Sequence, residues 1–283
     1  MIMEKAKVYF TDMRTGYGGL SLPQKLAKLI KAAGIGNIDF NKKFAAIKIH
    51  FGEPGNVSYL RPNYAKAVAD VVKEFGGMPF LTDCNTLYVG RRKHALEHIT
   101  AAYENGFSPF STGCHVIIAD GLKGTDEAYV PVPGGEVVKE AKIGKALMDA
   151  DIIISLNHFK GHEAAGFGGA IKNIGMGGGS RAGKMEMHHD GKPQVDQSKC
   201  IGWMPVSDVE SVPRSAPTEL RRSRTKKPTS TGTNALAVGA ASAHAPWMPL
   251  IRRKRVPVWK CLTSAWQNMR GRFWQAGRIS ISA

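Results

Sequence analysis

One glycine-rich segment, which begins at Asn157, carries most of the side chains that could do chemistry. His158 and His162 are four residues apart, a spacing that places two imidazoles on one face of a helix and that metal sites use. Gly161 lies between them and disfavours a helix. We therefore name His158 and His162 as candidate metal ligands. Two further histidines that could join such a site are His188 and His189.

The same segment contains glycines and lysines that suit an anion. Gly168 and Gly169 precede an apolar helical start and are followed by Lys172 and Asn173. Glycine allows a ligand to approach the backbone closely, and free N–H groups beside a lysine attract negative charge. We predict that these four residues bind a cofactor or a small anion, with tight packing as the alternative role of the glycines. The spacing matches neither a P-loop nor the dinucleotide fingerprint.

The first part of the chain alternates apolar strand-like runs with amphipathic helical stretches. This alternation predicts an α/β fold with a mostly parallel sheet and helices on both faces, over residues 1–198. The expected strands are Lys7–Phe10, Ala45–Ile49, Pro79–Thr82, His115–Ala119 and Ile152–Leu156. The expected helices are Ser21–Ala33, Asn63–Phe75, Lys93–Asn105 and Val137–Ala150.

Functional residues of such sheets gather at the carboxyl ends of the strands. The residues expected at this rim are His50, Glu53, Asp83, Cys84, Asp120, Asn157 and His158. The candidates for a catalytic role are His50, Lys160, His162 and Lys172. For His50, a structural role and ligand binding are equally open.

Other polar groups near the rim receive plainer interpretations. Cys84 and Cys114 have no CxxC partner and are expected to be buried thiols. The run Arg91–Lys93 opens a helix and is expected to be solvated, with a phosphate or carboxylate clamp as the alternative. No serine, histidine and acid motif supports hydrolase chemistry.

The composition changes sharply near residue 200. Residues 1–200 have a net charge of +5 and residues 201–283 a net charge of +11; all five tryptophans lie in the second part. A basic tail that binds nucleic acid is one interpretation. We do not favour nucleic acid as a partner, because the tail lacks any sustained period of 2 or 3.6 residues.

The genetic code offers a second interpretation of residues 199–283. If one base was lost in the codon of Trp203, the restored frame permits a C-x2-C-x2-C-x3-C run followed by proline, the pattern of a ferredoxin cluster. The permitted cysteines are at Ala235, Val238, Ala241 and Ala245. Cysteines are also permitted at Trp203 and Val206 after Cys200, but not at Glu210, where a fourth is expected. We interpret this region as a frameshifted remnant of a ferredoxin-like module, expected to be disordered.

Four stretches resemble one protein family, the Fe–S-centre proteins grouped as domain of unknown function 362. They are KIHFGEPGN (Lys48–Asn56), LTDCNTLYVGRR (Leu81–Arg92), the long histidine, lysine and glycine segment (Asn157–His188) and VDQSKCIG (Val195–Gly202). The resemblance implies an α/β domain followed by a ferredoxin-like module with two [4Fe-4S] clusters. The activity of that α/β domain is unknown in the family, and our hypothesis is that intact relatives have an electron-transfer or redox role, with a redox protein as partner.

Cys200 is the sole cluster-type ligand that remains in this chain. Because a cubane needs four thiolates, we expect the chain to bind no cluster. The alternative functions are a metal- or anion-binding enzyme, with a small anionic ligand as partner, and the basic nucleic-acid-binding tail. The sequence has no signal-like apolar core and no long apolar run, so a cytoplasmic protein without membrane contact is expected. The oligomeric state stays open.

Overall fold

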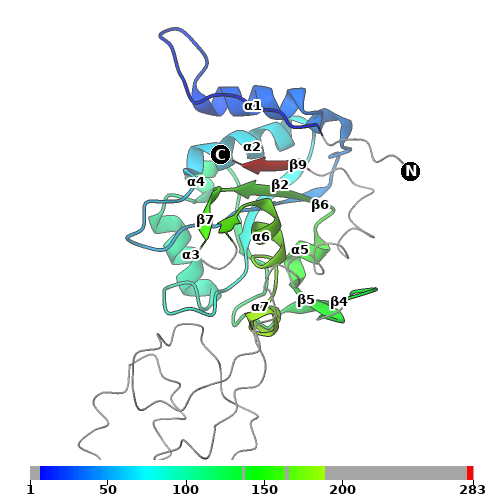
Figure 1. The fold of residues 1–283 in the computed structure, drawn as a ribbon. Coiled ribbons are helices and arrows are strands. Elements are labelled where there is room, and N and C mark those ends of the chain that lie inside the picture. The colour runs from blue at the N-terminus through cyan, green and yellow to red at the C-terminus, as the bar shows by residue number, and fades with distance from the viewer. Residues whose placement is uncertain (1–6, 136–137, 163–165, 189–278, 283) are drawn as a thin grey trace, which may run out of the picture. The chain divides into compact units, whose positions relative to one another are not determined.

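The computed structural model describes residues 7–135, 138–162, 166–188 and 279–282 (Figure 1). Its main sheet has five strands in the order β3-β2-β1-β6-β9, and every neighbouring pair is parallel. These strands are β1 (Phe44–Lys48), β2 (Met78–Asp83), β3 (Val116–Ile118), β6 (Ile152–Asn157) and β9 (Ile279–Ser282). Two antiparallel hairpins are added, formed by β4 (Glu127–Pro131) with β5 (Glu140–Gly144), and by β7 (Lys160–His162) with β8 (Gly166–Gly168).

The helices begin with strong local signals. Ser21 forms a capping box with Gln24 ahead of the first helix, and Pro62 occupies the first position of the second. The helices are α1 (Leu22–Ala32), α2 (Pro62–Glu74), α3 (Ala95–Glu104), α4 (Pro109–Thr112), α5 (Lys145–Asp149), α6 (Ala170–Gly175) and α7 (Arg181–His188), with a 3₁₀ turn η1 (Ile35–Asn37).

Strand β1 lies inside the sheet and divides its side chains between two cores. Ala45 and Ile47 pack with residues of α1, α2 and α3 on one face. Ala46 packs with residues of β5 and α5 on the other, where Ile174 of α6 also contacts the cluster. Both faces of the parallel sheet are thus covered by helices, which confirms the predicted fold class.

Two predicted elements are wrong. Val137–Ala150 was expected to be one helix, but Glu140–Gly144 forms β5 and only Lys145–Asp149 is helical. Lys7–Phe10 was expected to be a strand and has no regular secondary structure. A strand requires a hydrogen-bonded neighbour, which the pattern of one stretch does not reveal: β4 provides one for β5, whereas no described strand pairs with Lys7–Phe10.

The predicted tail lies almost entirely outside the described residues. Within it, β9 runs parallel to β6, with Ile279 opposite Ile154. The described residues up to Met187 and β9 belong to one compact unit, and the boundary predicted after residue 198 falls outside the described ranges. In the described part, no helix is both long and apolar enough to cross a membrane.

Candidate functional site

A buried ion pair lies at the carboxyl end of the sheet. Lys48 ends β1 and Asp83 ends β2; their side chains are 1% and 5% exposed, and Nζ lies 2.9 Å from Oδ1. Parallel strands bring their carboxyl ends to the same edge, which explains how residues so distant in sequence meet. Burial alone would raise the pKa of Asp83, but the positive charge of Lys48 and its neighbours outweighs burial and holds that pKa far below its usual range.

Asn173 of α6 holds Lys48 in place. Its Oδ1 accepts a hydrogen bond from Lys48 Nζ at 2.9 Å, and its Nδ2 donates to the Lys48 carbonyl and to Ser155 Oγ, each at 2.9 Å. The amide therefore ties α6 to β1 and β6. Asn173 was predicted to bind a cofactor; in this structure both ends of its amide contact the protein.

Arg92 extends the network to a second carboxylate. Its Nε lies 2.6 Å from Glu53 Oε2, and its Nη1 lies 3.7 Å from Asp83 Oδ2. The expectation that the run Arg91–Lys93 is solvated is wrong for Arg92, which is buried. Arg91 does lie on the surface, paired with Glu104. The segment that follows β2 brings Arg92 to Glu53. The place of Arg92 at the start of a predicted helix did not predict this ion pair.

Polar groups below the rim are buried as well. His98 Nδ1 lies 3.4 Å from Asn85 Oδ1, and Asn85 Nδ2 donates to Asp120 Oδ1 at 2.9 Å. Burial lowers the pKa of His98 to about 3 and raises the pKa of Asp120. Within the described ranges, three buried side-chain atoms have no hydrogen-bond partner, namely Thr82 Oγ1, His98 Nε2 and Asp120 Oδ2. The buried groups next to the ion pair are therefore polar and only partly satisfied by hydrogen bonds within the described residues.

We call three of the predicted residues the cationic rim: His50, which follows β1, and Lys160 and Lys172, which lie on β7 and α6; Lys160 is near enough to each of the other two for its charge to lower their pKa values. Burial lowers the pKa of Lys172, and the charge of Lys160 lowers it further. The His50 ring keeps an exposed edge, yet surrounding protein atoms, then Arg92, and to a smaller degree Lys160, lower its pKa to about 4. His50 is therefore neutral at pH 7, and its Nδ1 accepts a hydrogen bond from the Gly52 N–H at 3.0 Å.

The β7–β8 hairpin positions the two lysines. Lys160 pairs with Gly168, and a side chain at Gly168 would begin 3.2 Å from Cδ of Lys172. Because paired residues share one face of a hairpin, Lys160 and Lys172 lie on the same side. The alternation of side chains places Phe159 and Phe167 on the opposite side, where their ring centroids are 5.4 Å apart. The glycine at 168 thus leaves space for the lysine of α6.

The family model described as domain of unknown function (DUF362) matches residues 45–245, which include β1, β2, β6, the hairpin and α6. The chain belongs to the DUF362 family.

Individual relatives of this DUF362 chain are distant. The "Thylakoid-associated protein sll1697" of Synechocystis sp. is 28% identical over 127 residues, which span 43% of this chain and 34% of that protein. The lactate racemase apoprotein of Thermoanaerobacterium thermosaccharolyticum is 14% identical with a TM-score of 0.38, covering 61% of this chain and 36% of that one. A Thermotoga maritima crystal structure is 14% identical with a TM-score of 0.46, covering 92% and 49%. The chain thus spans about a third of the curated relative.

The predicted metal ligands of the DUF362 domain lie on the hairpin rather than on a helix. His158 is exposed just before β7, and His162 is partly buried at the end of β7. In the described ranges, no group of three or more histidine, cysteine or acidic side chains is arranged to hold a metal ion. Metal binding by His158 and His162 stays a prediction. Cys200 and His189 lie outside the described residues.

The two described cysteines of the DUF362 domain are buried free thiols, as predicted. Burial raises the pKa of Cys84 to about 12, and its Sγ donates to the Gly178 carbonyl at 3.4 Å. Lys184 is also buried, with Nζ 2.5 Å from the Gly179 carbonyl. These two contacts fix the glycine-rich loop from inside, so neither group is available at the rim.

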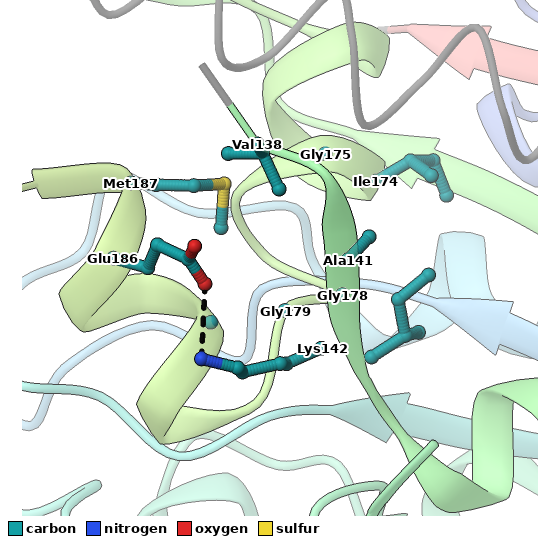
Figure 2. A pocket seen from close by; sticks show the side chains of 11 residues that line it. Val138, Ala141, Lys142, Ile174, Gly175, Gly178, Gly179, Glu186 and Met187 are labelled. Carbon is teal, nitrogen blue, oxygen red and sulfur yellow. Dashed lines mark ion pairs between the residues drawn. The ribbon is translucent and has the colours of Figure 1, made fainter. Parts of the chain in front are cut away.

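A separate small pocket lies beside β5, α6 and α7 (Figure 2). Its lining is apolar apart from Lys142 and Glu186, which form an ion pair at 3.0 Å. The other lining residues are Val138, Ala141, Ile143, Ile174, Gly175, Gly178, Gly179, Gly183 and Met187. Because its two charges neutralise each other, this pocket offers no attraction to an anion, and we place the candidate site at the cationic rim.

Proposed function

We propose that the DUF362 domain of this chain binds a small anionic ligand at the cationic rim. The observation that carries the proposal is that Lys160 and Lys172 lie on the same side of the β7–β8 hairpin and, among the described residues, have no carboxylate or hydrogen-bond partner. By contrast, the buried Lys48 is already neutralised by Asp83 at 2.9 Å. An anion would supply the missing counter-charge.

The surroundings support a ligand of small size. Gly168 and Gly169 precede Lys172, and the Cβ that Gly168 lacks would contact the lysine stem at 3.2 Å. A carboxylate or phosphate could therefore contact both the backbone and the amines. The neutral imidazole of His50, whose pKa is about 4, offers a hydrogen bond without adding charge.

Titration calorimetry with oxalate and with inorganic phosphate tests the proposal. We expect one of these anions to bind, and Lys160→Gln and Lys172→Gln each to weaken its affinity about tenfold or more, because a hydrogen bond to a charged group contributes about 1.5–3 kcal/mol. Lys28→Gln is the matched control, since Lys28 is an exposed lysine of α1 remote from the rim. Equal affinity in all three variants, or no binding of either anion, would contradict the proposal.

A second function concerns relatives with an intact tail, for which we propose electron transfer through [4Fe-4S] clusters. The restored cysteine spacing and the entry to the tail at Cys200 support it. This chain does not fit a cluster: Cys84 and Cys114 are buried in the domain, so two of its four cysteines remain, whereas each cubane needs four thiolates.

Two preparations test the frame interpretation. The protein as it stands should lack the brown absorbance of iron–sulfur clusters and stoichiometric iron with labile sulfide. A gene with one base restored at the codon of Trp203 should produce protein that binds iron and sulfide after reconstitution. Cluster binding by the present chain would overturn the first expectation, and a colourless restored protein would overturn the second.

A further inference from the structure

Lys172 differs from the other lysines of the site in its surroundings. Its side chain is partly buried, and its amine has no ion pair or hydrogen bond within the described ranges. Lys48 is bound to Asp83 and Asn173, and Lys184 to backbone carbonyls. Lys160 is exposed to water. Lys172 alone among these four lysines is both partly buried and, within the described ranges, without an ion pair or hydrogen bond at its amine.

A second positive charge close to an amine favours the neutral form of that amine, which is the nucleophilic form. A lysine attacks a carbonyl only in its neutral form, and partial burial together with a neighbouring positive charge increases the neutral fraction near pH 7. Both conditions hold here, since burial and the charge of Lys160 lower the pKa of Lys172. No acidic side chain of the described residues opposes this effect by pairing with either amine.

We propose that Lys172 forms an imine with the carbonyl group of a small anionic ligand of the 2-oxo acid class. This inference rests on the proposed anion site, because the carboxylate of the ligand would pair with Lys160. The neutral Lys172 amine adds to the ketone carbon and forms a C–N bond. The two protons of the amine nitrogen pass to the carbonyl oxygen, whose bond to carbon breaks as it leaves as water, so that the C=N bond of the imine forms without any oxidant or reductant.

The geometry favours Lys172 for this reaction. Lys160 and Lys172 share one side of the hairpin, so one can hold the carboxylate while the other meets the adjacent carbonyl carbon. Gly168 leaves room beside the side chain of Lys172, since a Cβ at position 168 would lie 3.2 Å from the Lys172 Cδ. Lys160 is thus a positioning residue that acts through charge.

Reductive trapping tests the inference on the full chain. The protein is incubated with pyruvate and sodium cyanoborohydride, and intact mass and peptide mapping locate any reduced adduct. We expect one adduct, at Lys172, and competition by oxalate, which has the charges but no ketone. Lys172→Arg keeps the charge without a nucleophile and should lose the adduct. Lys160→Gln should slow trapping and shift its pH profile to higher pH, whereas Lys28→Gln should change nothing.

The outcomes separate this inference from the proposed anion site. If oxalate binds but pyruvate gives no adduct, or adducts scatter over exposed lysines including Lys28, the imine is wrong and the anion site stands. If neither oxalate nor phosphate binds and no adduct forms, both proposals fail. An unchanged pH profile in Lys160→Gln would refute the role assigned to Lys160.

Discussion

Removal of one partner of the buried Lys48–Asp83 pair should destabilise the domain strongly. In Asp83→Asn, Lys48 keeps its hydrogen bond to Asn173 but loses the carboxylate 2.9 Å away, while its side chain stays 1% exposed. An uncompensated buried charge costs about 3–5 kcal/mol. Because a typical domain is stable by about 5–15 kcal/mol, this change should remove a large fraction of the free energy of unfolding.

Two further variants separate the effect of the buried charge from the effect of changing a side chain. Lys48→Met combined with Asp83→Asn removes both charges and should recover most of the loss, since neutral replacements of a buried pair are well tolerated. Asp70→Asn breaks the Lys66–Asp70 pair of α2, whose side chains are each 50% exposed, and should cost only about 0.3–0.5 kcal/mol.

The assay is urea unfolding at pH 7, followed by far-ultraviolet circular dichroism. Tryptophan fluorescence is unsuitable because all five tryptophans lie beyond residue 202, outside the described domain. At this pH the contribution of Asp83 to the free energy of unfolding is fully present. A carboxyl group whose pKa is lowered by folding stabilises the folded state above its unfolded pKa of about 3.9, and this stabilisation is lost on acidification. If Asp83→Asn costs no more than Asp70→Asn, the buried-pair argument is wrong.

Two other predictions concern the buried polar groups and the loop of the site. Burial lowers the pKa of His98 to about 3, so below about pH 6.5 this imidazole takes up a proton in the unfolded chain but stays neutral in the folded one. The free energy of unfolding should therefore fall by roughly 1.4 kcal/mol from about pH 7.5 to 5.5. His98→Gln should reduce this slope in urea titrations, and an unaltered slope would contradict the assignment. A Cβ at Gly177 would lie 2.3 Å from the Asn173 carbonyl, so Gly177→Ala should cost about 1–3 kcal/mol of unfolding free energy. Gly161→Ala, with nothing within 4 Å, should cost about 0.5 kcal/mol or less; equal losses would argue against tight packing at Gly177.

Periodicity and local end signals alone predict most of the elements that carry the site. Strands β1, β2, β3 and β6 and helices α1, α2 and α3 all overlap the predicted stretches, with ends within two residues of the predicted ones, because apolar spacing and helix caps act between residues close in sequence. The same reasoning places His50, Asp83 and Asp120 at the carboxyl ends of the strands. It could also have flagged Lys48, since a lysine inside the apolar run Ala45–Ile49 signals a buried, paired charge.

Long-range contacts lie beyond that reasoning. The partners of Lys48 are Asp83 and Asn173, 35 and 125 residues away. The strand β5 was missed for a different reason, because its pairing with the neighbouring β4 is not visible in the pattern of its own residues. The sequence by itself determined an α/β chain with a chemically rich glycine segment and a changed tail. The tertiary structure decided which lysines are neutralised inside and which remain at the rim, because charge pairing depends on distances that only the folded chain sets.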